Sequence, residues 1–180
     1  LKAAAMGAAF VTAGVVAVKT IADITKSLYD LGSQFDEAYD AIRIGTGATG
    51  DDLEALKDDF KDVYSSVPTT MEDASKAIAD YNTRLGVTGD VLSGLSSQAI
   101  AVSDMLGEDL NATIESSSQA FQQWNIDTNN MGKEMDYVFK VSQATGASFT
   151  GLMSNLKNYG PQMQELGFSF EQSAAMMGQL

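Results

Sequence analysis

Residues 85–106, LGVTGDVLSGLSSQAIAVSDML, contain a helix end, a helix start and an amphipathic stripe. Gly86 suits the left-handed position after a helix, Val87 suits a contact back onto the last turn, and Thr88 suits the cap of the next helix. The apolar residues that follow have the spacing of three and four expected of a helix with one buried face: Leu92, Leu95, Ala99, Val102 and Leu106. This stretch predicts two helices joined by a tight turn.

The same three-residue device recurs along the chain. It is seen at Gly47-Ala48-Thr49, Gly86-Val87-Thr88, Gly146-Ala147-Ser148 and Gly167-Phe168-Ser169, and Asn125-Ile126-Asp127 is a variant of it. We therefore predict structural helix junctions at Gly47, Thr49, Gly86, Thr88, Asn125, Asp127, Gly146, Ser148, Gly167 and Ser169. The separations of 39, 39, 21 and 21 residues favour a two-helix unit of about 39 to 42 residues, repeated about three times. The alternative is an ordinary all-α protein whose glycine-capped helices happen to have similar lengths.

Breaks within the units are expected at Val67-Pro68-Thr69, at Gly107 to Asp109 and at Gly146. Capping boxes are predicted from Thr69 to Glu72 and from Ser169 to Gln172. No sustained period-2 alternation predicts a strand. The expected fold is all-α, with serial helical hairpins preceded by a long Ala/Gly-rich helix from about Ala3 to Ile44. The expected domains are an apolar helix with an acidic extension at residues 1–45, and a helical-hairpin region at 46–180 that is a fragment of a longer chain.

The opening segment, residues 3–18, is uncharged and rich in Ala and Gly. It is shorter and less apolar than a typical spanning helix, which needs roughly 20 apolar residues. Three interpretations stay open: a small-residue helix that packs closely against its own kind, a segment that can enter a bilayer, and a processing signal.

Composition excludes several classes of function. The 180 residues carry 24 acidic and 11 basic side chains, a formal net charge of -13, which argues against specific nucleic-acid binding. The chain has no His and no Cys, so imidazole bases, thiol nucleophiles and the common zinc sites are unavailable.

The remaining candidate sites do not converge. The pairs Asp51-Asp52 and Asp58-Asp59 are expected on solvated helix faces or in first turns, since neighbours on a helix point about 100° apart. Residues 127–138 resemble a calcium loop only at their start, because Val138 stands where Glu is needed. Phe121, Trp124 and Tyr159 lie on apolar stripes and are expected in core or interhelical packing rather than in a ligand pocket. We predict no catalytic, cofactor-binding or metal site, and no enzyme activity.

Several stretches, in order, resemble the core region of tail tape measure proteins of long-tailed bacteriophages. They include Gly45-Thr46-Gly47-Ala48-Thr49-Gly50-Asp51-Asp52-Leu53, Leu85-Gly86-Val87-Thr88-Gly89, Ala144-Thr145-Gly146-Ala147-Ser148-Phe149, Tyr159-Gly160-Pro161 and Leu166-Gly167-Phe168-Ser169-Phe170-Glu171-Gln172. The resemblance covers nearly the whole chain. Asn125-Ile126-Asp127 departs from it, because the family usually keeps a glycine turn there.

The resemblance implies a structural virion protein that lies in the tail tube lumen or tail tip. Such a protein sets tail length during assembly and takes part in genome ejection, when it meets the host cell envelope. The implied partners are further copies of itself in a parallel homo-oligomer, usually a trimer, together with tail tube, distal tail or baseplate hub proteins and tail assembly chaperones. Residues 3–18 are the part expected to meet the host membrane, and no cofactor is implied.

Three other functions stay open from the sequence. One is a non-viral helical-repeat module that binds a protein partner on a concave face. Another is a fragment of an enzyme such as a cell-wall hydrolase, which the lack of His, Cys and converging carboxylates disfavours. The third is a dedicated membrane-active protein.

Overall fold

The computed structural model describes residues 21–179, with side chains from residue 30 onward, and this part of the chain is all-α as predicted. No strand occurs in it. The elements are α2 (Ile21–Thr46), α3 (Gly50–Ser66), α4 (Met71–Leu85), α5 (Gly89–Leu106), α6 (Leu110–Gln123), the 3-10 turn η1 (Thr128–Asn130), α7 (Met131–Thr145), α8 (Phe149–Glu165) and α9 (Phe170–Met177).

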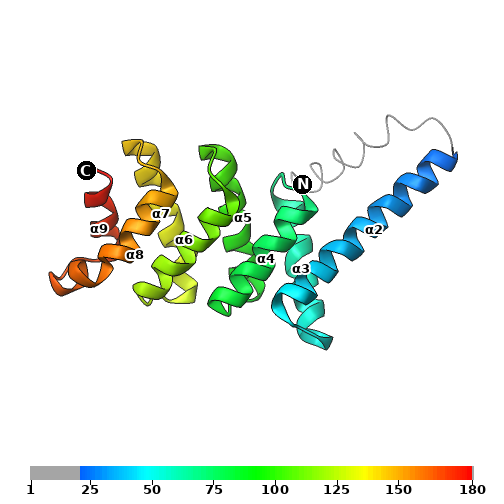
Figure 1. The fold of residues 1–180 in the computed structure, drawn as a ribbon, viewed down its shortest axis with the longest axis horizontal. Coiled ribbons are helices and arrows are strands. Elements are labelled where there is room, and N and C mark those ends of the chain that lie inside the picture. The colour runs from blue at the N-terminus through cyan, green and yellow to red at the C-terminus, as the bar shows by residue number, and fades with distance from the viewer. Residues whose placement is uncertain (1–20, 180) are drawn as a thin grey trace.

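The helices form an elongated array of two layers. One layer holds α2, α4, α6 and α8, each packed on the next, and the other layer holds α3, α5, α7 and α9 in the same way. Figure 1 shows the elements following one another along the long axis, from α2 in blue to α9 in red. Consecutive helices also pack across the two layers, for example α4 with α5 and α8 with α9.

The core runs the length of this array rather than gathering at one centre. Phe60, Ala99 and Val138 recur at the spacing of the first two predicted junctions, which we call the repeat interval, and all three are fully buried. Ala74 and Thr113 in the other layer are also one repeat interval apart and fully buried. Each layer therefore presents equivalent positions to the core in successive hairpins, as expected where an amphipathic helix pair recurs at a fixed spacing.

Helix α2 belongs to the same core as the hairpins that follow it. Its residues Ala38 and Ile42 are buried in one cluster with Phe60 and Ile78. The division of the chain near residue 45 stays a prediction. The predicted helix from Ala3 to Ile44 overlaps α2, and its part before residue 21 lies outside the described residues.

No helix within residues 21–179 is long and apolar enough to cross a membrane. The segment 3–18, for which membrane entry is one open interpretation, lies outside the described residues.

Candidate functional site at the helix junctions

Five of the predicted junction residues have left-handed backbone. The φ angle is 72° at Gly47, 67° at Gly86, 79° at Gly146, 84° at Gly167 and 50° at Asn125, the one described non-glycine residue with a positive φ. Such a residue ends a helix by turning the chain away while its N–H returns to the last turn. The Gly86 N–H, for example, donates to the Asn82 carbonyl at 2.8 Å.

The predicted side-chain caps divide into two groups. The Ser148 side chain accepts from the Gly151 N–H at 3.1 Å, and Asp127 accepts from the Asn129 N–H at 2.9 Å. The capping box predicted at Ser169 and Gln172 is confirmed, with both of its hydrogen bonds present. These three caps satisfy N–H groups that a helix leaves free in its first turn.

Thr49 and Thr88 do not cap their helices through the side chain, so this part of the prediction is wrong. Each is followed by a second left-handed glycine, Gly50 at φ 59° or Gly89 at φ 62°. The chain turns again at that glycine, which moves the hydroxyl away from the first-turn N–H groups. The predicted box at Thr69 is also displaced, because Thr70 accepts from the Asp73 N–H at 3.0 Å instead.

Two carboxylates from neighbouring hairpins reach helix starts, and neither contact was predicted from the sequence. Asp59 on α3 accepts from the Gly89 N–H at 2.9 Å, at the helix start that Thr88 leaves uncapped. Glu108, in the turn after α5, accepts from the N–H groups of Phe149 and Thr150 at 2.6 and 2.9 Å. The positive end of each helix dipole thus lies against a negative charge from another unit.

Asp59 corrects the expectation that the pair Asp58-Asp59 lies on a solvated face. Asp58 is exposed and pairs with Lys61 at 2.7 Å, whereas Asp59 is only 6% exposed. Burial raises the pKa of Asp59, and the hydrogen bond from Gly89 opposes that rise without cancelling it. A sequence signal existed, because Asp59 follows Leu56 by three positions and so lies at the edge of the apolar stripe.

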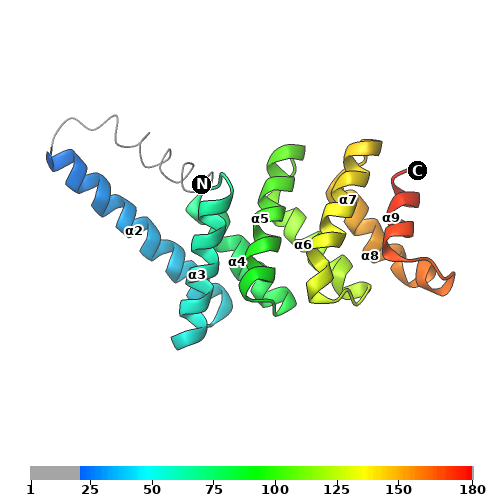
Figure 2. The same cartoon turned by 180° about the vertical axis from the view of Figure 1, so that it is seen from behind.

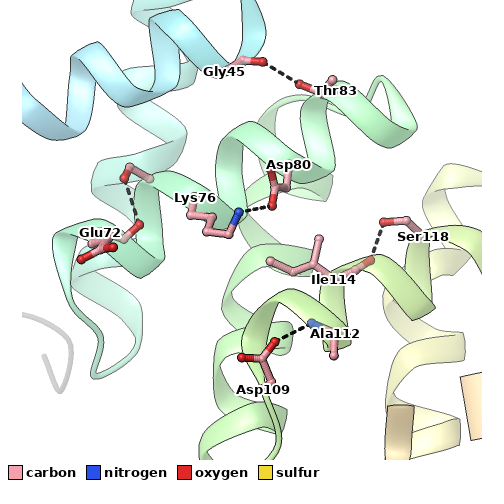
Figure 3. Close-up of polar contacts among 10 residues, drawn as sticks. Gly45, Glu72, Lys76, Asp80, Thr83, Asp109, Ala112, Ile114 and Ser118 are labelled. Carbon is pink, nitrogen blue, oxygen red and sulfur yellow. Dashed lines mark hydrogen bonds and ion pairs between the residues drawn. The ribbon is translucent and has the colours of Figure 1, made fainter. Parts of the chain in front are cut away.

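Polar contacts also join the carboxyl ends of helices in one layer. The Thr83 hydroxyl on α4 donates to the Gly45 carbonyl of α2 at 3.3 Å, as Figure 3 shows. The Gln122 side chain on α6 donates to the Arg84 carbonyl of α4 at 2.7 Å. The two donors are one repeat interval apart, and so are the two acceptors, which means that the same contact recurs at successive units.

A buried polar seam lies between α4, α5 and α6. The Tyr81 hydroxyl is 2.8 Å from the Ser117 hydroxyl, and the Ser103 hydroxyl donates to Thr113 at 3.0 Å. Full burial raises the pKa of Tyr81, so its hydroxyl stays protonated and serves as a fixed hydrogen-bonding group. The seam fixes how neighbouring hairpins meet, because each hydroxyl needs its partner once it is removed from water.

Glu134 on α7 and Ser96 on α5 are exceptions among the buried polar residues, because each has a side-chain oxygen with no hydrogen-bond partner in the described part of the chain. Glu134 is 5% exposed, and its unpartnered oxygen is Oε2. Burial, followed by the negative charge of Glu171, raises the pKa of Glu134, although Lys133 lies 3.5 Å from the other oxygen. The equivalent positions in α3 and α5 are Leu56 and Leu95.

The aromatic residues are placed as predicted in two of three cases. Phe121 is fully buried and Trp124 is 9% exposed, with its indole N–H donating to the Leu156 carbonyl at 2.8 Å. Tyr159 is 57% exposed, so its expected core position is wrong. Gly160 occupies the buried position instead, where an added Cβ would lie 2.9 Å from Trp124 Nε1. Adjacent helical residues face different directions, so Tyr159 points away.

The described residues show helix-to-helix contacts rather than a reactive centre. No group of three or more acidic side chains among them is arranged to hold a metal ion. A surface cavity of about 360 Å³ lies beside the α3–α4 and α5–α6 turns, and three acidic side chains, Asp73, Asp104 and Glu108, are among its lining residues. Glu108 is already engaged there as the cap of α8. The arrangement can position helices, and Figure 3 shows further local examples in the Asp109 to Ala112 cap and the Lys76 to Asp80 ion pair.

Comparison with known proteins gives two matches. The sequence profile of a family described as phage-related minor tail protein matches residues 57–180. A tape measure protein of Pneumococcus phage Dp-1 is 22% identical over 151 residues, which are 82% of this chain and 13% of that protein. The chain thus spans only a small part of the length of that relative. No solved structure matches the chain.

Proposed function

The chain belongs to the phage-related minor tail protein family, and we propose that it serves as a structural part of the phage tail that helps to set tail length. The observation that carries the proposal is the match over residues 57–180, which include α4 to α9 whole. The name of the phage Dp-1 relative supports the length-setting role. The family resemblance seen in the sequence is thereby confirmed, and the non-viral module is disfavoured.

The two-layer array makes the length-setting role testable, because the folded and extended forms differ greatly in reach. Neighbouring packed helices lie about 8–10 Å apart, so one folded two-helix unit adds about 10 Å along the array. The same residues in one continuous helix add about 58 Å. An extended chain that measures length and a compact folded module are therefore expected to give different tail lengths when one unit is added.

The location, partners and role in ejection are further parts of the proposal. We place the protein in the tail, in contact with further copies of itself and with tube and hub proteins. The described surface is rich in exposed carboxylates, such as Asp51 and Asp52 in the first turn of α3 and Glu54 just after it. Such a surface repels DNA, which favours passage of a genome through the same lumen during ejection.

The decisive experiment duplicates residues 86–124 in frame in the parent phage gene and measures tail length by negative-stain microscopy. We expect tails longer by about 58 Å if the unit is extended and by about 10 Å if it stays folded. A second phage, with residues 146–166 duplicated, gains only half a unit, which interrupts the alternation of the two layers. An extended chain then adds about 32 Å, whereas a folded array does not accept the insertion.

Two outcomes would overturn the proposal. Tails of unchanged length with both duplications, carrying the altered protein in normal amounts, would remove this region from length setting. Absence of the protein from purified tails would show that it is not a component of the tail. Western blotting of the same particles separates these two cases.

A further inference from the structure

The end of the array formed by α8 and α9 presents large apolar side chains to solvent. Tyr159 is 57% exposed, Leu166 72% and Met176 45%. Figure 2 shows α9 at the end of the array opposite α2, with no further helix beyond it in the described part of the chain. Met105, at the carboxyl end of α5 in the middle of the array, is also exposed and provides an internal reference.

Tyr159 occupies a position that is buried in the preceding units. It follows Ala120 by one repeat interval, Ala120 follows Tyr81 by another, and both earlier residues are fully buried. The Tyr81 hydroxyl contacts Ser117 on α6, which belongs to the next hairpin. This face is therefore the one that a unit presents to its successor.

Met176, in the other layer, also occupies a position whose counterparts in earlier units face the next unit. Its counterparts in earlier units, separated by whole repeat intervals, include Asp59 and Gln98. Asp59 on α3 accepts from the Gly89 N–H at the start of α5, and Gln98 on α5 donates to the Gly132 carbonyl in α7 at 3.1 Å. The side chains at this position in α3 and α5 thus reach the next helix of the layer, and the counterpart in α7 is the half-buried Tyr137. Met176 has no next helix of its layer within the described residues.

Leu166 repeats the pattern at the turn. It precedes left-handed Gly167 as Trp124 precedes left-handed Asn125. Trp124 is buried against the following hairpin, with its indole N–H donating to the Leu156 carbonyl on α8 at 2.8 Å. Leu166 has the corresponding place relative to its turn and is exposed, although it follows Trp124 by 42 residues rather than by one repeat interval.

We propose that the α8–α9 end face is covered by a further two-helix unit of the same polypeptide, beyond Leu180, packed in the register of the internal units. The end face continues the established interface between units, since Tyr159 matches a position that is buried there and Met176 matches positions whose side chains bond to the next helix. The length of the phage Dp-1 relative, of which this chain spans 13%, leaves ample chain for such a unit. This proposal does not depend on the role of the protein in the tail.

A second copy of the chain fits the face less well. The opposite end of the array begins with α2, a helix of 26 residues, whereas the internal helices of the same layer have 14 to 17. Stacking of copies end to end would therefore not reproduce the internal packing. The same polypeptide also supplies its unit at a high effective concentration, which a separate copy does not.

Methionine oxidation in the full-length protein tests the proposal directly. The protein is treated with dilute hydrogen peroxide, and peptide mass spectrometry gives the oxidation rate of Met176 and Met105, each divided by its rate in denaturant. We expect Met176 to be oxidised at least about fivefold more slowly than Met105, because a covered thioether reacts only when the contact opens. This protection should be unchanged on dilution.

A pair of variants on α8 locates the cover. Tyr159→Asp places a charge in the contact and should raise the oxidation of Met176 to the level of Met105. Asn158→Asp, at the exposed neighbouring residue, is the matched control and should leave Met176 protected. Equal oxidation of the two methionines in the unmodified protein, or persistent protection in Tyr159→Asp, would overturn the proposal. Protection that disappears on dilution would assign the face to a second copy and overturn it as well.

Discussion

Glu134 is a carboxyl group at a position where other units carry leucine, and it is buried with one oxygen unpartnered among the described residues. A buried carboxylate with one oxygen unpartnered is costly, because the protein does not replace the water that this oxygen loses. We expect Glu134→Leu to raise the free energy of unfolding at neutral pH by about 1–2 kcal/mol. Urea denaturation measures this, and Glu165→Leu on the exposed part of α8 is the control, expected to be nearly neutral. A loss of stability in Glu134→Leu would show that the carboxyl group is needed for packing.

The pH dependence of stability follows from the same residue. Because burial raises the pKa of Glu134 in the folded state above its ordinary value of 4.5, the folded protein holds this proton more tightly than the unfolded chain. The contribution to stability is complete below about pH 4.5 and is lost as the pH rises through the raised pKa. Glu134→Gln should flatten this fall in a comparison of melting temperatures from about pH 4.5 to pH 8. Parallel curves for both proteins would contradict the assignment.

Glu108 tests the caps that cross between units. Both of its oxygens accept N–H groups at the start of α8. Charge-assisted bonds of this kind are strong, and removing the acceptor leaves two donors unpaired, so Glu108→Ala should cost about 1–3 kcal/mol in urea denaturation. Glu72→Ala, in the exposed first turn of α4, should change stability by less than about 0.5 kcal/mol. Equal changes in stability in the two variants would show that Glu108 contributes no more than an exposed carboxylate does.

At the scale of the element, glycine has opposite effects at a junction and inside a helix. Gly86 has a φ of 67° after α4, whereas Gly94 lies within α5 with open space around it. We expect Gly86→Ala to lower the free energy of unfolding by about 1–2 kcal/mol, because a side chain is strained in the left-handed region. Gly94→Ala should raise it by about 0.5–1 kcal/mol, because alanine favours the helix. Changes of the same sign in the two variants would refute the junction assignment.

At the scale of the whole molecule, the array should tolerate the loss of a complete unit. Deletion of residues 86–124 joins Leu85 to Asn125, which has the left-handed conformation that Gly86 otherwise supplies. We expect this variant to keep the helix content per residue and a cooperative transition, with lower stability, as a quasi-one-dimensional array predicts. Circular dichroism and urea denaturation measure both properties.

Deletion of residues 86–106 is the matched control, since it removes α5 alone and breaks the alternation of layers. We expect this shorter deletion to abolish the cooperative transition even though it removes fewer residues. Equal disruption by both deletions would show that the hairpins are not interchangeable units.

Much of the architecture depends on local interactions, and the sequence by itself determined it. Helix formation follows from apolar residues three and four apart, and helix ends follow from glycine or Asn within one turn, so the all-α fold was predictable. The positions of Gly86, Asn125 and Ser169 at helix boundaries belong to this category. The family was also predictable, because the order of these motifs along the chain resembles tape measure proteins.

Only the tertiary structure decided which side chains serve contacts between units. Asp59 and Glu108 look like surface acids, and Tyr159 looks like a core residue, until the helices are stacked in two layers. Their surroundings come from residues far away in the sequence, and a rotation of α8 by one residue, about 100°, exchanges Tyr159 with Gly160 against Trp124. Helical periodicity constrains the face of each helix, whereas the packing of separate helices decides which residue of that face meets a partner.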